Sequence, residues 1–375
     1  MTATIAAAAA TAREWLFDAA FPFWLDKGVD GRNGGFVDLV EIDGRAVADS
    51  PKRTFVQGRQ VFSYAVAGRL GWGGKWREAV AMGLDTIERH CRHPEGGFIH
   101  SLDAGNRPAE TRRDLYDQAF VATTEAYGAE ALGEPERVDR ARAVFAELDR
   151  AWLRGPAGYW EGELPDPAYR RQNPHMHLLE AALAIRQTRW GNDADLARCN
   201  RLAGWFADHF FEPGRGLLPE YFDDRWRVAA DEAMQTVEPG HHFEWAWLLG
   251  VLKEAGGADL SASGERLWRF GLRHGIDRAR NVAVDELGLD GRVKSARARL
   301  WPQTERLKAA ITMADEPEIL AAFAGLQPYL ATPAAGACYD KMLPGGDFQP
   351  EPARASSLYH IVCAYAELLN LAARG

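Results

Sequence analysis

The chain has 375 residues, of which 47% are apolar and 26% are charged, as is ordinary for a globular enzyme. Its formal net charge of −9 argues against anionic partners, so we expect neither nucleic acid nor an acidic membrane surface to bind it. No apolar run approaches the roughly 20 residues that a membrane span needs. The 13 tryptophans offer flat apolar faces with one donor each, which suit sugar rings as well as cores.

Cysteine usage and the N-terminal segment indicate the compartment. The run from Ile5 to Ala10 follows no basic residue and soon meets Arg13 and Glu14, so we interpret it as the start of a helix and not as a signal peptide. We therefore expect a cytoplasmic protein with reduced thiols. The four cysteines show no Cys-x-x-Cys spacing that would indicate a disulfide framework or a zinc site: they are Cys91, Cys199, Cys338 and Cys363.

Helix-compatible segments with short glycine-rich interruptions dominate the chain. Gly71 with Gly73, and Gly133 with Pro135, are examples of these interruptions. We predict twelve helices, at 3–27, 55–71, 74–92, 113–132, 136–153, 174–189, 194–209, 241–255, 260–275, 302–314, 316–330 and 355–373.

Six similar segments lie between alternate helices. Each begins with glycine and continues with alternating apolar or aromatic residues, a pattern typical of a short β-hairpin or an extended loop. They begin at Gly34, Gly96, Gly158, Gly216, Gly288 and Gly336. The recurring unit of about 60 residues, two helices and one loop, predicts a repeat architecture. Six paired helices that close on themselves form an (α/α)6 barrel, so we predict an all-α single domain over residues 1–375.

Polar residues recur at the start of the second helix of each pair, which we take as the inner one. Residues at equivalent heights on six inner helices converge at one mouth of a barrel, and such groups are costly to bury without a role. They are Arg59, Asp117, His177, His241 with Glu244, Glu305 and His360.

The segment 238–250 contains the most specific pattern. Pro239 and Gly240 end the preceding segment, so His241 falls in the first turn of a helix, with Glu244 on the same face. A helix N-terminus lowers the pKa of an imidazole, whereas a carboxylate one turn away raises it and fixes the tautomer. We predict that Glu244 orients His241 and that this histidine is poised for proton transfer near neutrality.

Each of these residues also has a structural interpretation. Asp117 would then brace the barrel, Glu305 would hold a loop, and His360 would be a core histidine. His175 and His177 are two residues apart and point in different directions on a helix, so one of them is structural. Histidines with carboxylates are also compatible with zinc, but no His-Glu-x-x-His motif is present, and we predict no metal and no cofactor. Gly34-Gly35 and Gly96-Gly97 lack the spacing of a phosphate-binding loop.

The motifs together resemble those of the N-acylglucosamine 2-epimerase superfamily, which contains 2-epimerases and mannose isomerases. The resemblance covers almost the entire chain and implies an (α/α)6 barrel. The segment from Pro350 to His360 is more similar to the mannose isomerase branch than to the cellobiose epimerases. The resembling motifs are Gln57-Gly-Arg59, Asp114–Phe120, Asn173–Ala181, Pro239–Leu248, Leu300–Glu305 and Ser356–His360.

The resemblance implies roles for individual residues. His241 and His360 would form the acid/base pair, and Arg59 would hold the O1/O2 region of the sugar. Asn173 and His177 would bind hydroxyls or assist ring opening. Trp301 and Phe120 would shape the pocket, and we add Asp117 and Glu305 to the expected substrate-binding set.

We therefore expect an aldose–ketose isomerase of the D-mannose/D-fructose type that acts on a monosaccharide through a cis-enediol, as a monomer or a homodimer. A sugar 2-epimerase is the alternative. A glycoside hydrolase using two of Glu220, Glu244 and Glu305 would leave the histidine pair unexplained, and a sugar-binding barrel without catalysis would not need paired bases.

Overall fold

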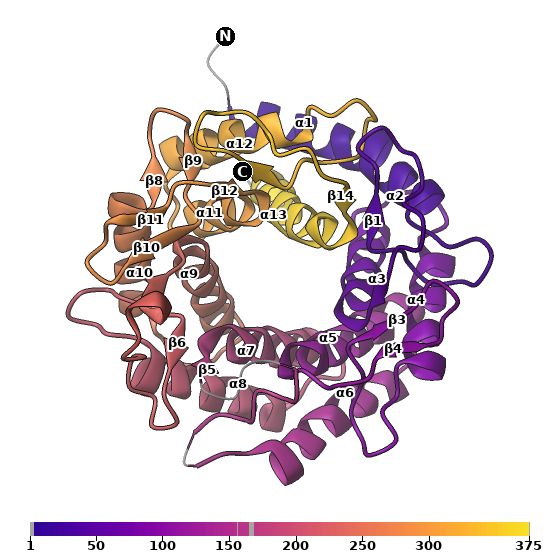
Figure 1. The fold of residues 1–375 in the computed structure, drawn as a ribbon, viewed down its shortest axis with the longest axis horizontal. Helices are drawn as coiled ribbons and strands as arrows, with labels where there is room; N and C mark the ends of the chain where they lie inside the picture. The colour runs from indigo at the N-terminus through magenta and orange to yellow at the C-terminus, as the bar shows by residue number, and fades with distance from the viewer. Residues whose placement is uncertain (1–3, 156, 165–168, 375) are drawn as a thin grey trace.

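Six helical hairpins form two concentric rings in the computed structural model, which describes residues 4–155, 157–164 and 169–374 (Figure 1). The inner ring contains α3 (Thr54–Arg69), α5 (Leu115–Leu132), α7 (Gln172–Gln187), α9 (Pro239–Glu254), α11 (Leu300–Thr312) and α13 (Ala355–Arg374). The outer ring contains α1 (Ile5–Glu14) with α2 (Phe21–Lys27), α4 (Trp76–His90), α6 (Glu136–Glu147), α8 (Asp193–Trp205), α10 (Ser261–His274) and α12 (Glu316–Leu330).

The predicted (α/α)6 barrel and its twelve helices are confirmed. Single π-helical turns extend three outer helices, at η1 (Trp15–Ala20), η2 (Leu148–Trp152) and η3 (Phe206–Phe210). The helices α7 and α11 begin two residues earlier than predicted, because Pro174 and Pro302 are accommodated within the first helical turn. The predicted start of the first helix at residue 3 lies outside the described residues.

Burial separates the two rings. Along α5 almost every side chain from Leu115 to Ala129 is buried, as expected for a helix surrounded by other helices. Along α10 the buried residues lie along one stripe with helical spacing, so the other face of this helix meets solvent: they are Gly264, Leu267, Trp268, Phe270 and Gly271. The ring closes because α13 packs against both α11 and α3.

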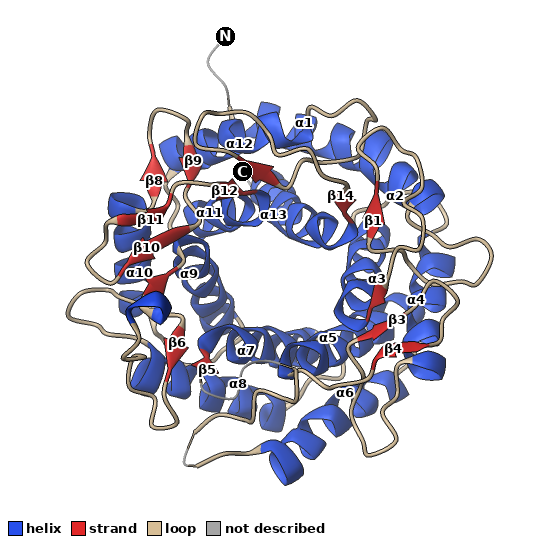
Figure 2. Cartoon of the chain, viewed as in Figure 1, coloured by secondary structure: helices blue, strands red, loops and turns tan. Residues whose placement is uncertain are grey.

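Short antiparallel strands fix where the inner helices begin (Figure 2). The residues just before each inner helix are extended and pair with a loop of the following unit, and the last unit pairs with the first. The pairs are β2 (Lys52–Arg53) with β3 (Ser101–Leu102), Asp114 with Gly162, β5 (Arg170–Arg171) with β6 (Tyr221–Phe222), β7 (Thr236–Val237) with β10 (Glu286–Gly288), β12 (Ala298–Arg299) with β13 (Lys341–Met342), and β14 (Ala353–Arg354) with β1 (Leu39–Val40).

The predicted hairpins are therefore only part of the pattern, because most of the two-stranded pairings join neighbouring units. The remaining elements add to these small sheets or cross the loops. They are β4 (Pro108–Glu110) beside β3, β11 (Val293–Ser295) beside β10, the pair β8 (Ile276–Asp277) and β9 (Val282–Ala283), and the 3-10 turn η4 (Glu232–Met234).

Buried side chains on the inner helices hold the glycine-rich loops in place. Gln57, Gln118 and Gln303 each bond both the N–H and the C=O of one loop residue: Phe36, Phe98 and Ala283. At the corresponding place His175 accepts the N–H of Tyr159, and His242 accepts that of Leu218. His175 is thus the structural member of the His175/His177 pair, as the sequence predicts for one of them.

Two further sequence expectations concern the whole chain. All four cysteines are buried free thiols, as predicted. Among the described residues, no helix combines the length and the apolarity required to cross a bilayer.

Gly58 marks the closest approach of α3 to α5. A Cβ at Gly58 would lie 2.4 Å from Thr124 Oγ1 and 3.2 Å from the carbonyl oxygen of Phe120. We expect Gly58→Ala to lower the free energy of unfolding by about 1–3 kcal/mol because of overpacking. Gly204→Ala is the matched control: it also lies in a helix, has no atom within 4 Å of the added Cβ, and should be neutral or slightly stabilising. Equal denaturation midpoints for the two variants would contradict this packing.

Candidate active site

A cavity of about 180 Å³ lies at the N-terminal ends of the inner helices. Every inner helix, or the residue that precedes it, contributes a side chain to its wall. Seven of the ten predicted site residues line it: Arg59, Asn173, His177, His241, Glu244, Trp301 and His360. Tyr116, Glu238 and Arg299 complete the wall.

The two candidate acid/base histidines have the same local geometry. The Nδ1 atom of His241 lies 2.9 Å from Glu220 Oε1, and the Nδ1 atom of His360 lies 2.9 Å from Glu305 Oε1. Both rings pack against the indole of Trp301, with ring-centroid distances of 4.8 and 6.0 Å. Because the glutamates occupy Nδ1, Nε2 is the nitrogen that each ring has left for chemistry in the cavity.

The prediction that Glu244 orients His241 is wrong. The carboxylate at Nδ1 belongs to Glu220, which comes from the loop directly before β6 and also accepts a 2.8 Å hydrogen bond from Gln172 Nε2. Glu244 lines the cavity, but its Oε1 atom is buried without a hydrogen-bond partner. Helical spacing indicated Glu244, whereas Glu220 is 21 residues away in sequence and no helical period connects it to His241.

The charges around the two histidines shift their pKa values in opposite directions. Burial lowers the pKa of His241, but the negative charges of Glu220, Glu238 and Glu244 more than compensate and raise it to about 9. Burial also lowers the pKa of His360, and the nearby Arg59 and Lys308 cations reinforce this, so it falls well below its ordinary value. The expected near-neutral poise of His241 is therefore wrong: at neutral pH His241 is an imidazolium and His360 a neutral imidazole.

Arg59 brings an uncompensated positive charge to the cavity. Its side chain is 5% exposed and donates to the Tyr116 hydroxyl at 2.6 Å. Its guanidinium lies over the rings of Phe120 and Tyr359 at 4.6 and 4.9 Å, where cation–π attraction partly offsets desolvation. Among the described residues no carboxylate forms an ion pair with it, and its Nε atom is buried without a partner. It is therefore suited to an anionic oxygen of a ligand.

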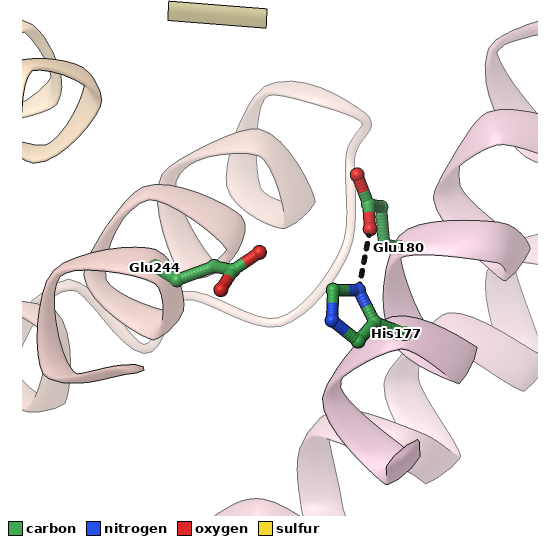
Figure 3. Close-up of side chains that lie close together, drawn as sticks. All are labelled: His177, Glu180 and Glu244. Carbon is green, nitrogen blue, oxygen red and sulfur yellow. Dashed lines mark hydrogen bonds and ion pairs between the residues drawn. The ribbon is translucent and has the colours of Figure 1, made fainter. Parts of the chain in front are cut away.

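His177 and Glu180 on α7 lie close to Glu244 on α9 (Figure 3), and two of the three, His177 and Glu244, line the cavity. Glu180 Oε2 lies 2.9 Å from His177 Nδ1, and Oε1 accepts a hydrogen bond from the Tyr359 hydroxyl. Burial raises the pKa of Glu244, as do Glu305 and Glu180. This shift favours the protonated form of Glu244, which can donate a hydrogen bond into the cavity.

Three predicted substrate-binding residues lie outside the cavity wall. Asp117 turns away: Oδ1 accepts the N–H of Phe55 and Oδ2 lies 2.8 Å from His100 Nδ1, so it braces the barrel. Phe120 lies behind the wall against Arg59 and His177. Glu305 is behind His360, whose Nδ1 it contacts.

A larger cavity of about 610 Å³ lies at the opposite end of the barrel. The residues that line it come mainly from the C-terminal ends of α3, α5 and α7, with Trp76 and Arg77 at the start of α4, and include no histidine. Of these two cavities, the smaller one is lined by the paired histidines, and we place the chemistry there.

Glu220, and not Glu244, should control the charge of His241. We expect Glu220→Gln to lower the pKa of His241 clearly, because the variant loses the nearest negative charge. Glu244→Gln, the matched control, removes a carboxyl group that contributes less to the pKa of His241 than Glu220 does, and should change that pKa less. Histidine ring titrations followed by NMR measure both; a larger effect from Glu244→Gln would contradict the assignment.

Comparisons with known proteins show the family of this chain. A family model described as N-acylglucosamine 2-epimerase (GlcNAc 2-epimerase) matches residues 34–364. The mannose-6-phosphate isomerase of Rhizobium meliloti (strain 1021) is 40% identical over 374 residues, which are 94% of this chain and 95% of that protein. The D-mannose isomerase of Thermobifida fusca is 30% identical over 270 residues, 63% of each chain. A solved D-mannose isomerase shares the fold, with a TM-score of 0.85 at 19% identity over 96% of this chain and 97% of that one. The chain therefore belongs to the N-acylglucosamine 2-epimerase family, as its motifs predict, and is a carbohydrate isomerase or epimerase.

Proposed function

We propose that this enzyme is an aldose–ketose isomerase that interconverts D-mannose and D-fructose. The observation that carries the proposal is the pair of histidines with opposite charge states in one cavity. A neutral His360 is a base, and a protonated His241 is an acid. Groups whose pKa values are driven apart are the usual arrangement for acid/base catalysis at one pH.

The proposed reaction starts from the open-chain aldose. The C2–H bond is acidic because the adjacent carbonyl accepts the electron pair, and Nε2 of His360 takes that proton. His241 donates its proton to O1, which gives a cis-enediol. His360 then returns its proton to C1 while the O2 proton passes to His241, so that C2 becomes the carbonyl carbon of the ketose and both histidines regain their starting states.

Arg59 contributes through charge. Negative charge develops on O1 and O2 as the C2 proton leaves, and a preorganised buried cation stabilises it. Asn173 lines the same cavity, and its Oδ1 atom is buried without a hydrogen-bond partner. An unsatisfied buried acceptor costs free energy unless a ligand donor satisfies it, which supports a role in binding a sugar hydroxyl.

The proposed chemistry predicts both the product and the path of the hydrogen. With D-mannose in heavy water, NMR should show fructose as the first product, with part of the original C2 hydrogen retained at C1, because one base moves it. His360→Asn should lower kcat by about 10²–10⁴-fold, as expected for loss of a general base. Glucose appearing first, with deuterium at C2 and no ketose, would instead indicate a 2-epimerase.

The basic residues around the mouth favour an uncharged sugar. Four arginines directly precede inner helices, and each already forms an ion pair with a carboxylate. The pairs are Arg53 with Asp38, Arg171 with Asp114 and Glu161, Arg299 with Glu238 and Asp285, and Arg354 with Glu351 and Asp340. A phosphate at C6 would have to compete with these carboxylates.

We therefore expect a higher kcat/KM for free D-mannose than for D-mannose 6-phosphate. Steady-state kinetics on both sugars at one ionic strength measure the difference. D-lyxose, which lacks C6, serves as a control for how much the enzyme depends on that end of the sugar. A clear preference for the phosphorylated sugar would contradict this assignment of the mouth and agree with the name of the Rhizobium relative.

A further inference from the structure

The two histidines differ in what lies behind their glutamates. At His241, the far oxygen of Glu220 accepts a neutral amide N–H from Gln172 at 2.8 Å. At His360, the far oxygen of Glu305 lies 2.6 Å from the ammonium of Lys308. The contact between Nδ1 and glutamate is 2.9 Å in both cases. The group behind each glutamate is therefore the clearest difference between the two pairs.

Lys308 is held rigidly in the interior. Its side chain is 0% exposed, and Nζ lies 3.5 Å from the centroid of the Trp247 ring. A lysine is almost never fully buried unless it is paired, and the cost of desolvating its charge is offset here by Glu305 and by the aromatic face. Lys308 does not line the cavity, so it does not touch the sugar.

The effect of such a cation follows from charge alone. A glutamate beside Nδ1 stabilises the imidazolium form of a histidine. When that glutamate also pairs with an ammonium, the net charge next to the ring is close to zero and the stabilisation is largely lost. Among the described residues no lysine or arginine forms an ion pair with Glu220, and a second carboxylate, Glu238, lies 4.0 Å from His241 Nδ1.

We propose that Lys308 is a positioning residue that acts through Glu305 to keep His360 as the neutral base of the site. In this arrangement Glu305 accepts a hydrogen bond from Nδ1–H of His360, but it does not make the ring basic enough to stay protonated. Nε2 therefore remains free to take a proton from the substrate. The inference rests on the proposed proton-transfer chemistry, and it adds a residue that distinguishes the base from the acid.

Other charged and titratable groups also face His360, and the inference takes them into account. The cation of Arg59 on α3 and the His177 ring act in the same direction as Lys308, whereas the Glu180 carboxylate opposes them. Glu244 on α9 lines the same cavity, and burial raises its pKa. Tyr359 and Cys363 are the titratable neighbours on α13 itself, and burial raises the pKa of each.

The test replaces the ammonium with the group found at the other histidine. Lys308→Gln gives Glu305 an amide neighbour, as Gln172 gives Glu220, and should make His360 take up a proton at higher pH. We expect the midpoint of its NMR ring titration to rise by about one pH unit or more. The acid limb of kcat/KM should move by the same amount, with activity recovering at high pH. Lys308→Arg keeps the charge and should leave both midpoints in place.

Several controls separate this role from a general loss of structure. Lys253→Gln makes the same change at an exposed lysine paired with Asp259, and should move neither midpoint. Glu305→Gln removes the carboxylate between Lys308 and the ring, and should lower the midpoint of the His360 titration because the ring then faces the Lys308 cation without an offsetting charge. A uniform loss of kcat at every pH, with the His360 titration unchanged, would overturn the proposal.

The ring titration needs no substrate, so it stands even if the enzyme proves to be an epimerase. If Lys308→Gln does not fold, Lys308→Met provides the same test, since it also removes the charge. The unmodified enzyme gives an independent check: at pH 7 the NMR signals should show a neutral His360 and a charged His241. The reverse, or two rings that titrate together, would contradict the role given to Lys308.

Discussion

The pairing between extended residues of neighbouring units is the constraint on which the site depends. Each inner helix begins directly after a segment that pairs with the loop of the following unit, and β14 returns to β1 to complete the circle. These pairings hold the N-terminal ends of six separate helices at one mouth. Side chains that are 300 residues apart, such as Arg59 and His360, therefore line the same cavity of about 180 Å³.

Within that mouth, charge is distributed unevenly. On one side Glu220 and Glu238 lie close to His241 and keep it protonated. On the other side Lys308 offsets Glu305, and Arg59 adds a second positive charge near His360. Two histidines with the same hydrogen-bond geometry can thus serve as acid and base at one pH. The two histidines therefore differ in charge because of the residues around their glutamates, and not because of a difference in their own hydrogen bonds.

The architecture was readable from the sequence because it repeats. Glycine-rich loops about every 60 residues, and polar residues that recur at the start of alternate helices, predicted the closed double ring. The side-chain contacts were less predictable, because the loops differ in length and helical spacing constrains only neighbours on the same helix. Glu244 was paired with His241 on that spacing, but Glu220 reaches it from a loop. Asp117 lies near the N-terminal end of α5, as predicted, but its side chain points away from the cavity and contacts His100.

The other site residues that the sequence did not predict have partners that are far away in the sequence. Glu238 directly precedes α9 and Arg299 directly precedes α11, and a hydrogen bond joins these two residues of neighbouring units. Glu305 was predicted as a site residue, but its contact with His360 spans 55 residues and depends on how α13 packs beside α11. No local pattern predicts which oxygen of a glutamate meets a histidine and which meets a lysine.

The central claim is that His241 and His360 act on the same two carbons of one open-chain sugar. A crystal structure with a linear hexitol, which imitates the open chain but cannot react, tests this most directly. The account predicts a hexitol in the cavity beside Trp301, with Nε2 of both histidines within hydrogen-bond reach of the hydroxyls at C1 and C2 and with Arg59 near the same oxygens. A hexitol bound at the opposite end of the barrel, or one that meets only a single histidine, would contradict it.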